Sequence, residues 1–140
     1  MKVEFDSEPA YLRVLSNLQF ESARYYQMKG QSTKSEDLTL QALAFYRELF
    51  AVESDNLRLA ATLAELELLQ AIHYKSQLQH DKNQQSCSSA KSLLVPLQLN
   101  NKKPQYIQPY ARALSCLNEL EQHPELQQLL QKSAIALTTF

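Results

Sequence analysis

The sequence predicts an all-α protein of about six helices that pair into three antiparallel hairpins. Apolar residues recur three or four positions apart in six segments, which is the spacing of a helix with one buried face. No stretch shows the sustained alternation with β-branched residues that a strand requires. A third observation is an internal repeat, because a shift of 48 positions superposes the first hairpin on the second.

Each of the six segments is defined by its apolar positions. They run from Leu12 to Tyr26, from Leu38 to Leu49, from Leu59 to Tyr74, from Ala90 to Leu97, from Tyr110 to Leu117 and from Leu126 to Leu137. The 140 residues suffice for one domain with a core, so residues 1–140 are expected to form a single helical-repeat domain.

Turn and capping residues divide the first half of the chain. Gly30, the single glycine, is expected to end the first helix. Thr33-Lys34-Ser35-Glu36 fits a capping box for the second helix, and Asp55 can cap the third.

Polar residues and prolines divide the second half. The polar run from His80 to Ser86 is the longest candidate linker. Pro96 is expected to kink or shorten the fourth helix, and Pro109 to move the start of the fifth beyond Pro104, because proline lacks the backbone N–H of a helix interior.

The repeat gives the hairpin boundaries. The shift of 48 places Ala23 on Ala71, Tyr26 on Tyr74 and Ala42 on Ala90. The hairpins are then expected at residues 9–56, 57–104 and 105–138, the third without the same register. The alanines are predicted to lie at helix–helix contacts.

These residues resemble the tetratricopeptide (TPR) repeat. Ala23, Tyr26 and Gly30 are similar to its first helix and turn, and Ala42, Tyr46 and Leu49 are similar to its second helix. The resemblance covers roughly residues 10–104 and implies a right-handed array of hairpins. Each unit has about seven extra residues between its helices, compared with the family's usual 34-residue repeat.

The resemblance also implies a concave groove, lined by the first helix of each hairpin, that holds a peptide or partner helix. By position, the groove-facing residues would be Asn17, Phe20, Arg24, Gln27, Glu65, Leu68, Ile72 and Lys75. Phe20 and Leu68 would be adjacent apolar contacts for the ligand, with Arg24 and Lys75 beside them. The lysine-and-asparagine clamp of some family members is absent.

Composition argues against several partners and chemistries. A net charge of −1 does not suit binding to nucleic acid. The longest uncharged apolar stretch, Leu93–Leu97, is far too short to span a membrane. One glycine is too few for a phosphate loop or a dinucleotide fingerprint. No cofactor is expected, and a cytoplasmic location is expected because the chain as given carries no leader sequence.

The residues with reactive side chains show no catalytic or metal-binding arrangement. His73, His80 and Cys87 are seven apart, which places successive groups about 10 Å apart along a helix, too far to share a zinc ion. Cys116 is interpreted as a small core residue. Two cysteines cannot form a disulfide framework, and they leave the redox compartment open, with a reducing one slightly favoured.

The sequence therefore predicts a non-enzymatic interaction module or adaptor. Its expected partner is a protein or peptide, and a homodimer stays open. The alternative is a regulatory or sensory helical domain of a larger signalling or transcription protein, with a small molecule bound between hairpins.

Overall fold

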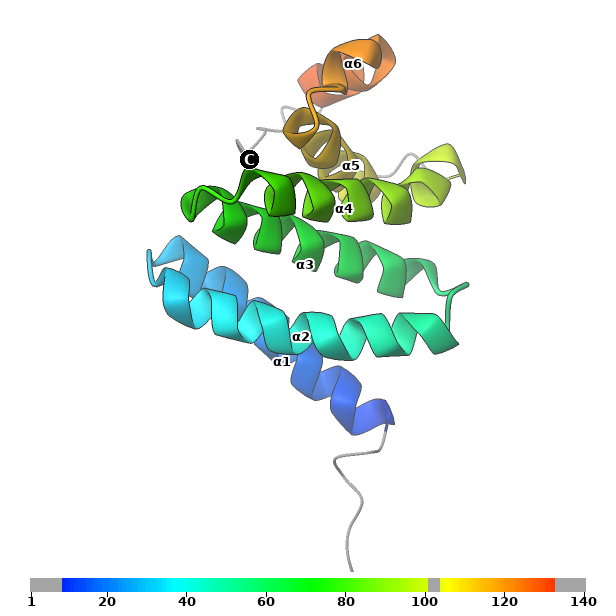
Figure 1. Cartoon of the computed structure of the whole chain (residues 1–140). Helices are drawn as coiled ribbons and strands as arrows, with labels where there is room; N and C mark the ends of the chain where they lie inside the picture. The colour runs from blue at the N-terminus through cyan, green and yellow to red at the C-terminus, as the bar shows by residue number, and fades with distance from the viewer. Residues whose placement is uncertain (1–8, 101–103, 133–140) are drawn as a thin grey trace, which may run out of the picture. The chain divides into compact units, whose positions relative to one another are not determined.

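The computed structural model describes residues 9–100 and 104–132, and this part of the chain contains helices and no strand. The prediction of an all-α fold with six α-helices is confirmed. The helices are α1 (Pro9–Met28), α2 (Ser32–Val52), α3 (Leu57–Ser76), α4 (His80–Asn100), α5 (Pro104–Cys116) and α6 (Pro124–Lys132), with a 3₁₀ turn, η2 (Leu120–Gln122), before α6 (Figure 1).

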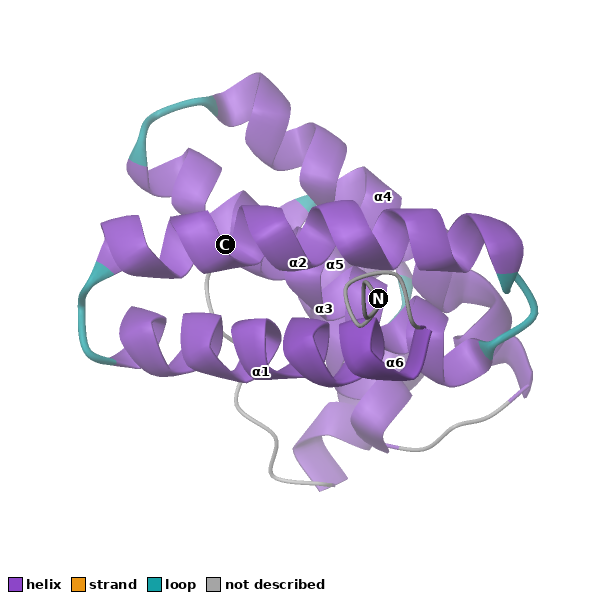
Figure 2. Ribbon diagram, turned by 90° about the horizontal axis from the view of Figure 1, so that it is seen from below, coloured by secondary structure: helices purple, strands orange, loops and turns teal. Residues whose placement is uncertain are grey.

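The chain divides into two compact units, Met1–Glu53 and Ser54–Phe140. In the first unit, α1 and α2 form an antiparallel hairpin (Figure 2). In the second unit, α3 and α4 form another hairpin, α5 packs on both of them, and α6 and η2 pack against each other and against α5. The division falls three residues before the predicted boundary between hairpins. One domain across residues 1–140 stays a prediction.

The first hairpin turn is a Schellman motif. The N–H of Gln31 donates to the carbonyl of Tyr26 at 2.9 Å, and the N–H of Gly30 donates to the carbonyl of Gln27 at 3.2 Å. Gly30 has φ of 75°, in the left-handed region that glycine adopts without a steric cost. Gly30 therefore ends α1, as predicted.

The same motif closes α3 and α5. After α3, Gln79 donates to the carbonyl of Tyr74 at 2.9 Å, and the left-handed residue is Leu78, at φ 59°. After α5, Glu119 donates to the carbonyl of Leu114 at 2.8 Å, and the left-handed residue is Asn118, at φ 59°. Leu78 lies 48 positions after Gly30, whereas Asn118 lies 40 after Leu78. The third hairpin thus shares the turn but not the spacing.

A side-chain bond across the helices also recurs after 48 residues. In the first hairpin, Ser35 Oγ donates to the carbonyl of Ala23 at 2.8 Å, and in the second, Asn83 Nδ2 donates to the carbonyl of Ala71 at 2.8 Å. Both alanines have an exposed fraction of 0%, and so do Ala42 and Ala90. The four alanines therefore lie in close contacts, as predicted, and the two hairpins have the same internal register.

The second and fourth helices begin earlier than predicted. The structure has three residues between α1 and α2, and α2 begins after Gln31, whose side chain makes no capping bond. Helix α4 begins at His80, so the polar run predicted to be a linker is its first two turns. Asp81 in the first turn favours this start because its charge complements the helix dipole. The extra repeat length lies in the helices, which have 20 or 21 residues.

Two further local predictions are wrong. The cap of α3 is Asn56 rather than Asp55, since Asn56 Oδ1 accepts from the N–H of Leu59 at 3.1 Å. Helix α5 begins at Pro104 and continues through Pro109, so the later start predicted for it is wrong. Helix α4 continues through Pro96 to Asn100 and is not shortened there, and a kink at Pro96 stays a prediction. A proline at the first position of a helix costs no hydrogen bond there.

Leu78→Gly should raise the free energy of unfolding by about 0.5–1 kcal/mol. A branched side chain in the left-handed region costs about 1–2 kcal/mol, and glycine removes this cost. Part of the gain in stability is lost because glycine raises the conformational entropy of the unfolded chain. Little packing is lost, because Leu78 is 78% exposed. Urea unfolding measures the change. Leu78→Ala is the control that keeps the backbone strain, and an equal gain in that variant would contradict the explanation.

Candidate interaction surface and disulfide cluster

The eight residues predicted to line a groove differ widely in exposure. Asn17, Arg24 and Lys75 are exposed, and Gln27, Glu65 and Ile72 are half-buried. Phe20 and Leu68 are 5% and 2% exposed, so they are core residues and are not available to contact a ligand. That part of the prediction is wrong because the face of α1 that holds Phe20 packs inward.

The remaining groove positions stay a prediction. Four of them belong to the first unit and four to the second, and each unit is compact by itself. Within the first unit, Arg24 pairs with Glu21 at 3.6 Å, and its guanidinium carbon lies 5.4 Å from the centre of the Phe20 ring.

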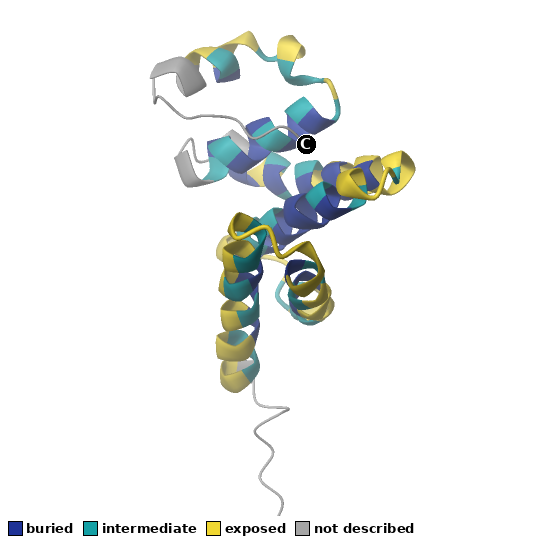
Figure 3. Cartoon of the chain, turned by 90° about the vertical axis from the view of Figure 1, so that its left-hand side faces the viewer, coloured by how far each residue is buried: buried dark blue, intermediate teal, exposed yellow. Residues whose placement is uncertain are grey.

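A different face of α1 presents apolar side chains to solvent. We call this face the α1 stripe. It consists of Tyr11, Val14, Leu15, Leu18 and Tyr25, which are 40%, 61%, 38%, 57% and 53% exposed. Their spacing of three, four and seven residues aligns them along one side of the helix. Met28, 83% exposed, continues the apolar surface at the C-terminal end of α1. Exposed residues lie along the length of α1 in Figure 3.

Sequence periodicity missed the stripe because α1 is apolar on two sides. Phe20 and Ala23 are buried and Leu12 is half-buried, whereas Leu15 and Leu18, in the same apolar segment, are exposed. Ser16 is only 2% exposed and is part of the buried side. Ser16 marks the buried side of α1, but a serine is usually exposed, so its burial could not be predicted from the sequence.

The charges near the stripe are mostly neutralised within the first unit. Arg13, near the start of α1, forms an ion pair with Glu53, which follows the end of α2 at the same end of the hairpin. Lys29 lies 5.7 Å from the centre of the Tyr25 ring, at the end of the stripe. On α2, burial raises the pKa of the Tyr46 phenol, an effect that the positive charge of Arg13 opposes and the negative charge of Glu21 adds to. Between Leu18 and Tyr25, the exposed Glu21 lies on the same side of α1, where it pairs with Arg24.

The second unit holds a disulfide between Cys87 of α4 and Cys116 at the end of α5. The sulfurs are buried, since the residues are 0% and 5% exposed, and they pack with Ala71 and Leu117. Cys116 is a core residue, as interpreted from the sequence, but its bond to Cys87 was not predicted. The partner cysteines are 29 positions apart, and closing a loop of this length contributes about 3–4 kcal/mol in the chain-entropy treatment.

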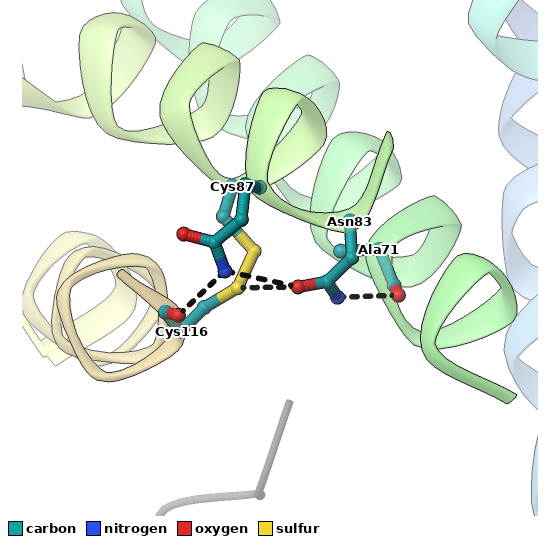
Figure 4. The surroundings of a disulfide bond; sticks show 5 residues. Ala71, Asn83, Cys87 and Cys116 are labelled. Carbon is teal, nitrogen blue, oxygen red and sulfur yellow. Dashed lines mark hydrogen bonds between the residues drawn. A yellow bond between two sulfur atoms is a disulfide. The ribbon is translucent and has the colours of Figure 1, made fainter. Parts of the chain in front are cut away.

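Amide side chains surround the disulfide. Besides its bond to Ala71, Asn83 places its Oδ1 3.4 Å from the Sγ of Cys116 (Figure 4). Gln84 Nε2 donates to the carbonyl of Cys116 at 3.1 Å, and Lys91 forms an ion pair with Glu119 just beyond α5. The end of α5 is thus held to α4 by one covalent and two polar interactions.

Two hollows lie in the described part of the second unit. One, of about 420 Å³, is lined by residues 78–82 of the α3–α4 turn, and the other, of about 250 Å³, lies beside η2. Within residues 9–100 and 104–132, no three His, Cys, Asp or Glu side chains gather closely enough to hold a metal ion. Cys87, one of the three residues considered as zinc ligands, is bonded to Cys116 instead.

The fold and these features define an all-α protein of helical hairpins with an exposed apolar helix face and a buried disulfide. Comparison with known proteins finds no match, whether to a family model, to a curated protein or to a solved structure. None of the described helices combines the length and the apolar character needed to cross a membrane.

Proposed function

We propose that the protein is a non-enzymatic interaction module that binds an amphipathic helix of a partner protein on the α1 stripe. The observation that carries this proposal is the exposure of five large apolar side chains, 38–61% each, on one face of a single helix. Apolar side chains that gather on an exposed face mark interaction sites on soluble proteins.

The spacing of the stripe supports a helical ligand. Tyr11, Val14 and Leu18 follow the three- and four-residue steps by which one helix packs on another, and Tyr25 lies seven residues after Leu18. Tyrosines at both ends suit this role because they combine a large apolar area with a polar group and are enriched among the residues that dominate binding energy. The polar Asn17 and Arg24 lie beside the stripe on the same helix, where they would form a hydrated rim.

The resemblance of the hairpins to the TPR repeat gives further support, since proteins of that family bind peptides and helices. The repeated turn and the repeated bond to the alanine carbonyl are what two copies of one hairpin unit would have in common. The proposed surface differs from the groove predicted by that resemblance, because Phe20 and Leu68 are buried.

Leu18→Gln should weaken binding of the partner at least tenfold, which corresponds to about 1.4 kcal/mol. The partner is first captured from the native host with the intact chain, identified and purified, and its affinity is then measured by calorimetry. Leu18 is 57% exposed, so the substitution leaves the fold intact.

Leu40→Gln is the matched control, because Leu40 lies on α2 and is 46% exposed. It should bind as the wild type does. Equal affinity of the Leu18 variant would place the binding surface elsewhere. Sedimentation of the isolated chain distinguishes a second copy as the occupant, since only self-association shifts with protein concentration.

A further inference from the structure

We call Cys87, Cys116 and the neighbouring Ala71, Asn83 and Gln84 the disulfide cluster. Its polar groups suit both oxidation states of the cysteines. In the disulfide, Cys116 Sγ has no proton, so its 3.4 Å distance from Asn83 Oδ1 is an ordinary contact. In the dithiol, the same sulfur carries a proton, and Asn83 Oδ1 lies within reach as its acceptor. The reduced Cys87 would lie among apolar neighbours, where a thiol behaves as a small hydrophobic group.

Asn83 is fixed in the orientation that this requires. Its Nδ2 donates to the carbonyl of Ala71 on α3, which leaves Oδ1 directed toward the end of α5. Figure 4 shows Asn83 between Ala71 and Cys116. Gln84 Nε2 lies 3.3 Å from the same Oδ1 and also donates to the carbonyl of Cys116. These bonds do not depend on the S–S bond.

The first hairpin shows that this fold does not need sulfur at the Cys87 position. The residue 48 positions earlier is Thr39, which is 0% exposed and whose Oγ1 donates to the carbonyl of Ser35 at 2.7 Å. The two hairpins otherwise have the same register and the same bond to the alanine carbonyl. The cross-link is therefore an addition specific to the second hairpin.

From these observations we propose that Cys87 and Cys116 form a reversible redox latch, which fastens α5 to α4 when oxidised and loosens it when reduced, without unfolding either unit. The oxidant is a low-molecular-weight disulfide. The thiolate of one cysteine attacks it and releases one thiol, and the second cysteine displaces the other thiol from the mixed disulfide. Two cysteine thiols and one disulfide thus give the protein disulfide and two free thiols.

Burial sets how the exchange occurs. With exposed fractions of 0% and 5%, neither sulfur can be attacked in the closed structure, so the end of α5 must open first. Gln84 and the Lys91–Glu119 pair hold the same end, and they limit this opening in the reduced state.

The test compares hydrogen exchange of the intact chain in oxidised and in reduced glutathione. Amides of α5 from Ile107 to Cys116 should exchange at least tenfold faster in the reduced chain, while amides of α1 and α2 keep their rates. The helical circular dichroism should stay nearly unchanged, and oxidised glutathione should restore slow exchange.

A double variant, Cys87→Thr with Cys116→Ser, serves as the control, and its exchange should not respond to glutathione. The proposal is overturned by equal α5 exchange rates in the two wild-type states, by general loss of helix on reduction, by failure of the disulfide to re-form, or by a glutathione response in the double variant.

Discussion

Leu94→Ala should lower the free energy of unfolding of the second unit by about 2–5 kcal/mol. Leu94 has an exposed fraction of 0% and lies in α4, the helix that packs against both α3 and α5. The substitution removes three buried carbon atoms and leaves a cavity that helices held by a disulfide cannot readily collapse to fill. Chemical denaturation of the oxidised chain, followed by circular dichroism, measures the loss.

Leu57→Ala provides the comparison, since Leu57 is 47% exposed at the start of α3. Its cost should stay below about 1 kcal/mol, because most of the side chain is already in water. Similar costs for the two variants would mean that Leu94 is not part of a closely packed core.

Ala71→Leu should destabilise the second unit by about 1–3 kcal/mol through overpacking. Ala71 has no exposed surface, touches the disulfide and accepts the bond from Asn83, so a larger side chain must displace α4 or the amide. The melting temperature should fall by several degrees. An unchanged melting temperature would show that the helices do not meet at this alanine.

Ala23→Leu extends this test to the first unit, where Ala23 has the equivalent position and accepts from Ser35. Its cost should resemble that of Ala71→Leu if the two hairpins share one internal register. Ala51→Leu on the exposed side of α2 is the control and should leave stability nearly unchanged.

The sequence predicted the helices and the alanine contacts because both depend on periodicity. A period of three to four residues persists along each segment, and small residues mark the places where two helices approach closely. The turn positions were harder to predict. Leu78 adopts the conformation of Gly30 although leucine disfavours it, since the motif is imposed by the hairpin rather than by that residue. The start of α4 was missed because its first residues are polar and exposed.

Which apolar residues are buried, and which cysteines are bonded, could not be predicted from this one sequence. Helix α1 has apolar residues on two sides, and only the packing of α2 decides that Phe20 is buried while Leu18 is exposed. Cys87 and Cys116 are 29 positions apart, and their Cα atoms approach to 6.2 Å only because α5 folds back on α4. Such a pair cannot be identified from spacing.

The bond between Cys87 and Cys116 also determines how the chain responds to tension. When the ends of the oxidised protein are pulled apart, the segment between the two cysteines cannot lengthen, because the force passes through the sulfur atoms. Twenty-nine residues correspond to roughly 100 Å of extended chain. The loop between the cysteines therefore bears none of the load, and the reduced chain has a correspondingly greater maximum length.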